Sequence, residues 1–373
     1  MSSSKLFKPY NIGPLTIGHR VVMAPLTRFR ANKDHTHTDM AIEYYSQRAS
    51  VPGTLLFSEA TLVSAQAGGC DNAPGIWSDA QVDSWKRVTE AVHAKGSFIG
   101  IQLWANGRQA SPEVLARDGL PYVSASDVPM AGKSAKPTPL THDQIKSYIA
   151  DFALAARNAR RAGFDLVELH AANGYLLNQF IDTNSNTRTD EYGGSTEKRL
   201  RFVKEVIDAV VAETGQDRAG IRLSPFSSFG DMRDQGTQAD YTALIEWLRD
   251  TYPSFAFIHV IEARVAGSVD ASSKETTDFA LDAWRRDDKT RAYLAAGGFN
   301  GEDGQIFANT KDVAIVYGRH YISNPDLPLR IAYNHEMHPY DRSTFYSPGS
   351  SAGYIDQPFA TDLIGKQLPV SAN

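Results

Sequence analysis

An imidazole, a carboxamide and a phenol fall within six residues of one another in the stretch HAANGYLLNQF, residues 170–180. His170 and Asn173 both offer N–H donors, and a carbonyl oxygen held between two such donors becomes more electrophilic. Tyr175 has an ordinary phenol pKa of about 10, so it is protonated at neutral pH and suited to donate a proton. Two donors for an oxyanion and one acid for a neighbouring carbon predict reduction of a polarised double bond.

The end of a short apolar run carries these residues, and eight such runs recur along the 373 residues. Segments with helical periodicity separate them, as in residues 142–163, where Gly163 supplies the stop. This alternation predicts an α/β fold with a parallel sheet covered on both faces, and eight units predict one (β/α)₈ TIM barrel as a single domain over residues 1–373. We expect the strands at residues 20–25, 54–60, 97–103, 166–172, 219–225, 255–261, 291–298 and 312–318.

The connections between these runs differ in length. Residues 7–19 predict an N-terminal β-hairpin that caps the bottom of the barrel. The two long connections, 105–140 and 262–275, follow strands, so we expect them at the C-terminal face as lids. His35 and His37 lie in the polar tract HTHT and are expected to be exposed to solvent. No metal site is expected, since His170 has no second ligand at a useful spacing.

Composition narrows the class of protein. Hydrophobic residues make up 42% and charged residues 22%, as in globular proteins, and the formal net charge is −5 with scattered basic residues. This pattern argues against a nucleic-acid or anionic-membrane partner. Cys70 is the only cysteine, and no run approaches the ~18 apolar residues of a membrane span. We therefore expect a cytoplasmic protein that is a monomer or a homodimer.

The ends of the last two strands suit a phosphate-bearing ligand. Gly297 and Gly298 let the backbone approach a ligand closely, because glycine has no Cβ. Gly318 and Arg319 follow the last strand, and a guanidinium can grip phosphate oxygens bidentately. A phosphate site commonly forms after strands seven and eight of this fold. Either glycine site taken alone is also consistent with a tight turn that closes the barrel.

Three other strand-end residues suit a planar heterocycle. Gln102 offers donors and an acceptor, as the edge of an imide-like ring requires. Arg222 could stabilise negative charge on that ring, but an ion pair with Glu168 in the core is an alternative role for it. Thr27 could hydrogen-bond a ring carbonyl, or it could simply cap its strand.

At these residues the sequence resembles the Old Yellow Enzyme family of FMN-dependent ene-reductases. The most specific element is H-x-x-N-G-Y-L-x-x-Q-F at 170–180, followed by N-x-R-x-D-x-Y-G-G-S at 186–195. The run RASVPGTLLFSEAT, residues 48–61, resembles fungal members of the family. Further matches span nearly the whole chain in family order: RVVMAPLTRFR (20–30), IQLWANGR (101–108), IRLSPF (221–226), LAAGGF (294–299), YGRHYISNPDLP (317–328) and YDRSTFY (340–346).

The resemblance implies an NAD(P)H-dependent flavoprotein oxidoreductase that takes hydride from NADPH and reduces the activated C=C bond of α,β-unsaturated aldehydes or ketones. It implies that His170 and Asn173 hold the carbonyl oxygen of the substrate and that Tyr175 donates the proton. Trp104 and Tyr346 would shape the substrate cavity.

The resemblance also implies one non-covalently bound FMN at the top of the barrel. It places Thr27 at the flavin O4 side, Gln102 at the pyrimidine edge and Arg222 near N1 and O2. The remaining cofactor residues divide into those lining the ring and those around the phosphate: Pro25, Leu26 and Ala60 for the ring, and Gly297, Gly298, Gly318 and Arg319 for the phosphate.

The sequence departs from the family pattern at two places. Gly298 stands where many members carry Asn, and EARV, residues 262–265, replaces the commoner E-P-R-V. Two other functions remain open. A hydrolytic barrel would need two opposed carboxylates, for which Glu59 and Glu262 are the strand-end candidates. A flavoprotein that binds FMN without completing net reduction would be marked by loss of the phenol at position 175, and that phenol is present.

Overall fold

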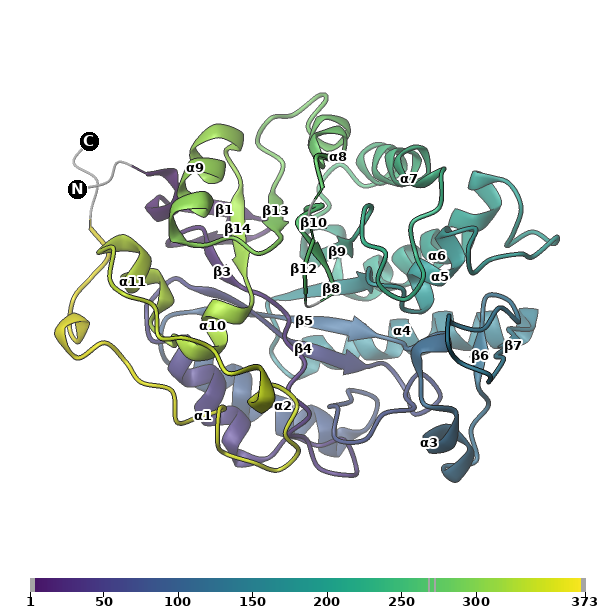
Figure 1. The fold of residues 1–373 in the computed structure, drawn as a ribbon, viewed down its shortest axis with the longest axis horizontal. Coiled ribbons are helices and arrows are strands. Elements are labelled where there is room, and N and C mark those ends of the chain that lie inside the picture. Colours follow the sequence, from purple (N-terminus) through teal and green to yellow (C-terminus); the bar gives the residue numbers. More distant parts are fainter. Residues whose placement is uncertain (1–3, 268, 272, 370–373) are drawn as a thin grey trace.

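Eight parallel strands close into a barrel at the centre of the computed structural model, which describes residues 4–267, 269–271 and 273–369 (Figure 1). The strands follow one another around the barrel in chain order, which confirms the predicted (β/α)₈ architecture. They are β3 (Val21–Met23), β4 (Leu55–Leu62), β5 (Phe98–Trp104), β8 (Leu166–Ala171), β9 (Ala219–Leu223), β10 (Phe257–Ile261), β13 (Tyr293–Ala296) and β14 (Ala314–Tyr317).

Helices connect successive strands on the outside of the barrel. The longer ones are α1 (Asp39–Arg48), α2 (Asp79–His93), α4 (His142–Arg161), α6 (Thr196–Thr214), α7 (Thr237–Thr251), α8 (Asp278–Trp284) and α9 (Gly301–Lys311). Shorter α-helices lie in the connections: α3 (Pro112–Arg117), α5 (Leu176–Ile181), α10 (Arg319–Ser323) and α11 (Leu327–Ala332). Single 3₁₀ turns are η1 (Lys5–Phe7), η2 (Gly107–Gln109), η3 (Gln216–Arg218), η4 (Arg342–Thr344) and η5 (Thr361–Leu363).

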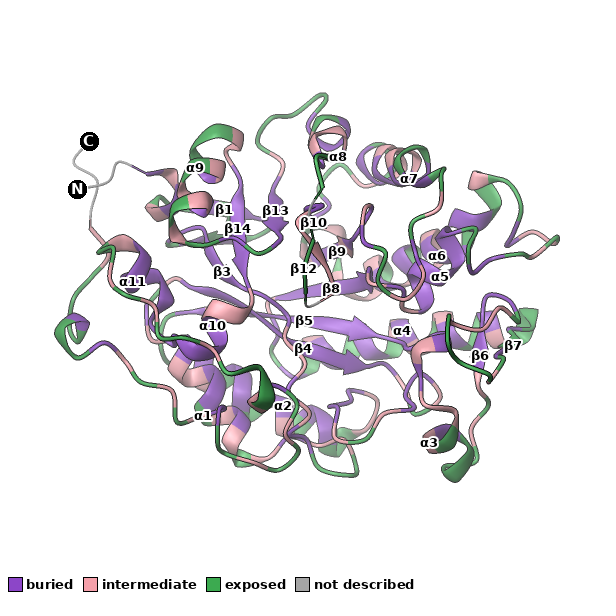
Figure 2. Ribbon diagram, viewed as in Figure 1, coloured by how far each residue is buried: buried purple, intermediate pink, exposed green. Residues whose placement is uncertain are grey.

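The strands are mostly apolar, as expected where both of their faces are covered. Figure 2 shows the barrel strands as buried and the exposed residues on the outer surfaces of the helices and loops. Two helices begin as their sequences predict, since Ser78 with Gln81 and Thr141 with Gln144 each form a reciprocal capping box. Gly163 has a φ of +87° just after α4, as expected of a helix stop.

The predicted N-terminal hairpin is present as β1 (Tyr10–Ile12) and β2 (Leu15–Ile17), paired antiparallel. Its alternate residues Tyr10, Ile12, Leu15 and Ile17 are buried in one apolar cluster with the lower barrel interior. The hairpin thus closes the amino-terminal end of the barrel and leaves the other end for a ligand.

The two long connections hold more structure than their composition indicates. Residues 105–140 include α3 and a short parallel pair, β6 (Val123–Ser124) and β7 (Thr138–Pro139). Residues 262–275 include an antiparallel hairpin, β11 (Val265–Ala266) and β12 (Val269–Asp270). A lid role for either connection stays a prediction. Among the described residues, no helix combines the length and the apolar character that a membrane crossing requires.

One glycine of α9 gives a test of the packing of this helix on the barrel. A Cβ at Gly304 would lie 1.9 Å from the hydroxyl oxygen of the buried Tyr317, whereas a Cβ at Gly301 would meet nothing closer than 3.5 Å. We expect Gly304→Ala to lower the free energy of unfolding by roughly 1–3 kcal/mol through overpacking. Gly301→Ala, the matched control in the same helix, should leave stability unchanged or raise it slightly. Thermal unfolding of both variants measures this, and equal melting temperatures would contradict the packing.

Candidate active site

A cavity of about 320 Å³ opens at the carboxyl ends of the barrel strands. Its volume lies at the lower end of the roughly 300–1,000 Å³ that small-molecule sites occupy. All of the residues predicted for the site line this cavity, although they come from every part of the chain: Pro25, Leu26, Thr27, Ala60, Gln102, Trp104, His170, Asn173, Tyr175, Arg222, Gly297, Gly298, Gly318, Arg319 and Tyr346. The structure therefore brings the predicted set together, and the role of each member is a separate question.

Strand register aligns the polar residues of the cavity floor in rows. On neighbouring strands Ala60 is opposite Gln102, and Gln102 is opposite Glu168. Two residues further along β8, His170 is opposite Arg222 of β9. Because parallel strands in a barrel point the same way, each row faces the same end of the molecule.

Glu168 is a buried carboxyl group beneath the cavity, and its two oxygens already have partners. The amide of Gln102 donates to Oε1 from Nε2 at 2.7 Å, and His259 donates from Nδ1 to Oε2 at 2.7 Å. The core ion pair considered for Arg222 is therefore not formed. The Nε of Arg222 is buried without a hydrogen-bond partner in the described part of the chain. Burial lowers the pKa of Arg222, but a guanidinium remains charged at neutral pH, so this cation is free to face a ligand.

His170 and Asn173 present polar groups that the protein leaves unmatched. Nδ1 of His170 and Oδ1 of Asn173 are buried and lack hydrogen-bond partners within the described residues. Burial, with Arg222 and His259 nearby, holds the pKa of His170 well below its usual range, so the imidazole is neutral. Asn173 has a φ of +55°, a left-handed conformation that Asn tolerates better than most residues. Its backbone is fixed by an N–H bond to Ser224 Oγ at 2.8 Å.

Tyr175 lies beside this pair. Its ring meets that of His170 edge to face at 4.7 Å and that of Trp104 at 5.1 Å. Burial raises the pKa of Tyr175 further above its ordinary value of 10, so the phenol keeps its proton at neutral pH. The arrangement therefore holds a neutral imidazole, a carboxamide and a protonated phenol on one side of the cavity.

The opposite end of the cavity is built from glycines and one arginine. Gly297 and Gly298 both have positive φ, and a Cβ at Gly298 would meet Arg319, Asp270 and Val265 at 3.3 Å each. Arg319 makes a bidentate pair with the Asp270 carboxylate of β12, in which Nη1 lies 3.1 Å from Oδ2. The carboxylate of Asp270 thus already occupies the guanidinium of Arg319, where a phosphate was predicted. The absence of a side chain at position 298 leaves room for this carboxylate.

The outer wall depends on two buried arginines that carbonyl oxygens surround. Arg28 donates to the backbone oxygens of Phe345 and Gly353, at 3.1 Å and 2.7 Å. Arg30 donates to five backbone oxygens, four of them in residues 344–352. The C-terminal segment is thereby fixed across α1, and Tyr346 is brought to 5.7 Å from the ring of Phe29.

Comparisons with known proteins identify the family of the chain. A family model described as the NADH:flavin oxidoreductase / NADH oxidase family matches residues 5–338. The chain belongs to this family. It is 45% identical over 367 residues to the chanoclavine-I aldehyde reductase fgaOx3 of Penicillium roqueforti (strain FM164), which covers 96% of this chain and 98% of the relative.

Two solved structures show the same fold over nearly all of this flavin oxidoreductase. The Old Yellow Enzyme from Pichia sp. AKU4542 superposes with a TM-score of 0.89 at 34% identity, covering 100% of this chain and 97% of the other. Morphinone reductase in complex with tetrahydroNAD has a TM-score of 0.85 at 37% identity, covering 96% and 98%. The protein is therefore an Old Yellow Enzyme-type fungal member and an NAD(P)H-dependent flavin oxidoreductase, the type that acts on activated alkenes.

The residues present fit FMN. The unpaired cation of Arg222 suits the edge of a flavin on which negative charge develops, and Gln102 lies in the next row of the floor. The glycine backbone and Arg319, already carrying a carboxylate, suit a phosphate. Bound there, the ring would lie along Pro25, Leu26 and Ala60, which line the cavity between these two ends.

Several cavity residues were not predicted individually. Phe299 and Phe345 lie within motifs that pointed to the site, so their position carried a signal. Phe29 and His320 also line the cavity and lie within the motifs at 20–30 and 317–328, whereas Phe229 lies in none of the motifs that match the family. His259 donates a hydrogen bond to Glu168 and orients it. In the sequence it is a single polar residue within an apolar strand.

The strand-end carboxyls that a hydrolytic barrel would use do not line the cavity. Glu262 accepts hydrogen bonds from the hydroxyl and backbone N–H of Thr277. Glu59 is fully buried behind the wall. One expectation was wrong: His37 is 6% exposed rather than solvent-exposed, because its ring packs against Trp85 with ring centroids 4.1 Å apart. His35 is half-buried.

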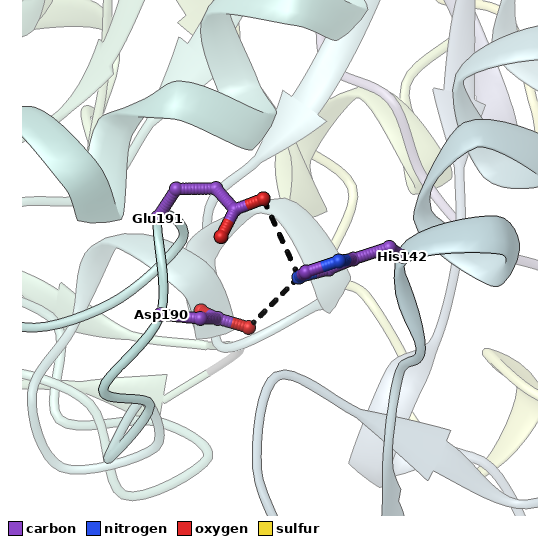
Figure 3. Close-up of side chains that lie close together, drawn as sticks. All are labelled: His142, Asp190 and Glu191. Carbon is purple, nitrogen blue, oxygen red and sulfur yellow. Dashed lines mark hydrogen bonds and ion pairs between the residues drawn. The ribbon is translucent and has the colours of Figure 1, made fainter.

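Outside the cavity, one group of described side chains has the composition of a metal site (Figure 3). Nε2 of His142 lies 3.1 Å from Asp190 and 3.5 Å from Glu191. Both oxygens of Asp190 also accept from the guanidinium of Arg188, which lowers the pKa of this carboxyl. A cation there would have to compete with Arg188, so the group is an ion-pair network that ties α4 to the turn before α6.

The Asp270–Arg319 pair predicts a measurable effect on cofactor binding. We expect Asp270→Asn to tighten FMN binding by the flavin-free protein by ~1.5- to 5-fold, because a phosphate need no longer displace a carboxylate pair that contributes roughly 0.2–1 kcal/mol. Asp303→Asn, which removes the partner of Arg264 without touching Arg319, is the control. Quenching of flavin fluorescence gives the dissociation constant of FMN for each variant. If Asp270→Asn leaves this constant unchanged, the Asp270–Arg319 pair does not weaken phosphate binding.

Proposed function

We propose that this flavin oxidoreductase is an ene-reductase that uses NADPH to reduce the activated C=C bond of α,β-unsaturated aldehydes and ketones. The observation that carries the proposal is the unmatched polar pair at His170 and Asn173 beside a protonated Tyr175. Buried polar groups are usually hydrogen-bonded in a folded protein, so an imidazole and a carboxamide left open in a cavity point to a hydrogen-bonding ligand. A relative named as an aldehyde reductase supports a carbonyl-bearing substrate.

The cofactor contacts follow from the two ends of the cavity. Thr27, Gln102 and Arg222 would hold the ring of FMN, and Arg319 with the glycine backbone would hold its phosphate. When bound non-covalently there, FMN supplies hydride chemistry that no side chain of the cavity can provide.

The cavity side chains have separate roles toward the substrate. An N–H of the neutral His170 imidazole and the Nδ2–H of Asn173 would donate to the carbonyl oxygen, drawing electron density from the conjugated double bond. The β-carbon becomes the electrophilic end and receives hydride. The hydroxyl of Tyr175 delivers its proton to the α-carbon, and the raised pKa of this phenol keeps the proton available across the neutral range.

NADPH is proposed to occupy the same cavity before the alkene enters. The sequence holds no G-x-G-x-x-G after a strand, which a separate dinucleotide module would require. A neighbour solved with tetrahydroNAD supports a nicotinamide partner. Oxidation of NADPH against a panel of enals, enones, maleimides and nitroalkenes tests the proposed activity, with NADH as the alternative donor. A purified flavin-containing protein that reduces none of these alkenes would overturn it in favour of a flavoprotein without net reduction.

Removal of the phenol should separate the two halves of the reaction. We expect Tyr175→Phe to leave FMN content and NADPH oxidation nearly intact and to slow alkene reduction by roughly 10²–10⁴-fold, because only the second half needs a proton donor. Tyr122→Phe, which removes a phenol hydrogen-bonded to Arg108 outside the cavity, is the control. Anaerobic stopped-flow traces measure each half separately. Unchanged turnover of a weakly activated enone would remove Tyr175 from the proton-donor role.

The oxyanion pair can be tested without turnover. Phenols stacked on a flavin give a long-wavelength charge-transfer band, and the phenolate oxygen would take the place of the substrate oxygen between His170 and Asn173. We expect the combined change His170→Ala and Asn173→Ala to abolish this band while FMN stays bound, because both donors to the oxygen are lost. A spectral titration with a para-substituted phenol measures the effect. Undiminished phenol binding would show that the pair does not hold the oxygen.

A further inference from the structure

Behind the cavity wall lies a carboxyl group that the proposed reaction does not use. Glu59 is completely buried, and the next residue, Ala60, lines the cavity. Its position results from an irregularity in β4: Phe57 pairs with Gly100 and Ala60 with Gln102, so three steps on β4 match two steps on β5. Such bulges occur often beside active sites because they redirect a side chain.

The contacts of Glu59 connect it to the segment that carries Thr27. Its Oε2 accepts a hydrogen bond from the backbone N–H of Arg28 at 3.1 Å. Its own N–H donates to the hydroxyl of Tyr45 at 2.8 Å, which fixes the bulge against α1. The carboxyl thus binds the amide that directly follows Thr27.

That segment is held in an unfavourable conformation. Phe29 has a φ of +53°, in the left-handed region that costs a non-glycine residue on the order of 1–3 kcal/mol. The side chains of Arg28 and Arg30 hold one side of the segment through backbone oxygens. Glu59 holds the other side through a backbone N–H, so both attachments determine where Thr27 and Phe29 lie in the cavity.

The second oxygen of Glu59 is left open. Oε1 is buried without a hydrogen-bond partner among the described residues, and Nε2 of His37 lies 3.8 Å from it. Both ring nitrogens of His37 also lack partners there. Burial lowers the pKa of His37 to about 3, so the imidazole is neutral and one of its nitrogens is a hydrogen-bond acceptor facing the carboxyl group.

We propose that Glu59 is a positioning residue that holds Thr27 against the flavin, and that protonation of its carboxyl loosens this hold. The inference rests on the proposed function, because it takes Thr27 to contact FMN. As a carboxylate, Glu59 gives the Arg28 N–H a charge-assisted hydrogen bond, which is roughly twice as strong as a neutral one. When Oε1 gains a proton from solvent, the proton stays on the carboxyl group with Nε2 of His37 3.8 Å away, and Oε2 becomes a weaker, neutral acceptor.

The groups around Glu59 bring the pKa of its carboxyl group close to neutral pH. Burial raises the pKa of Glu59 to about 7, against the lowering effect of the Arg28 and Phe29 amides and of two arginines. The ionisable groups that face it come from the wall segments, α1 and the C-terminal segment: Arg28, Arg30, His37, Tyr45 and Tyr354. The phenols and the neutral imidazole carry no charge near pH 7, so the carboxyl itself titrates there.

The effect on stability has a defined sign. Because the folded-state pKa is raised from 4.5 to about 7, the folded protein holds this proton more tightly than the unfolded chain. The stability that results is complete below pH 4.5 and is lost as the pH rises through about 7. Glu59→Gln is isosteric and uncharged, so it should fold at least as stably as the wild type at alkaline pH.

The test is the reduction potential of bound FMN from about pH 5.5 to about pH 8.5, in the holoenzyme of each variant. We expect the wild type to show a change of slope near the pKa of Glu59, about 7, that Glu59→Gln abolishes while keeping FMN bound. Glu59→Ala should lose both the change of slope and part of the FMN affinity, because it also removes the acceptor. Glu262→Gln, the same change at the other buried strand-end carboxyl, should keep the change of slope.

A double variant shows whether Glu59 acts through Thr27. Thr27→Ala should shift the potential, and adding Glu59→Gln should cause no further pH-dependent change. The inference is overturned if the change of slope of the reduction potential against pH persists in Glu59→Gln. It is also overturned if the effects of Thr27→Ala and Glu59→Gln on the potential are additive. The ene-reductase proposal stands in either case. If Thr27→Ala leaves the potential unchanged, Thr27 does not contact the flavin, and the inference fails with that assignment.

Discussion

The parallel pairing of β5, β8, β9 and β10 determines where every reactive group of the cavity floor lies. Hydrogen-bonded register places Gln102 opposite Glu168 and His170 opposite Arg222. A shift of one residue on any of these strands would turn its side chains to the other face. The chemistry of the site therefore depends on backbone bonds that none of the reactive side chains makes.

Within that framework the protein satisfies some buried polar groups and leaves others open. Glu168 has a partner for each oxygen, so it orients Gln102 and His259 without neutralising Arg222. Arg222, His170 and Asn173 each keep a buried polar atom without a partner in the described chain, and such an atom costs on the order of 1–3 kcal/mol. This distribution concentrates unmet hydrogen-bonding capacity in one cavity, where a bound ring and a substrate oxygen can use it.

The sequence predicted the barrel, its eight strands and the membership of the cavity, because apolar runs and strand-end motifs are local patterns. It did not predict what depends on bulges and distant contacts. His37 looked exposed because its neighbours are polar, yet Trp85, which is remote in sequence, covers it. Glu59 looked like a strand-end carboxylate, but the bulge in β4 turns it behind the wall. No local pattern indicated that Asp270 would reach Arg319 across a hairpin.

The wall of the cavity combines residues from the two ends of the chain. Arg28 and Arg30 lie near the start of the chain, and the backbone oxygens around them belong mostly to residues 344–353. During translation all eight barrel strands leave the ribosome before those oxygens do. Two buried cations at the rim must therefore stay hydrated until the last segment arrives. The cavity wall is completed only when residues 344–353 pack against Arg28 and Arg30, so a chain shortened before residue 344 would keep all eight barrel strands and lack this part of the wall.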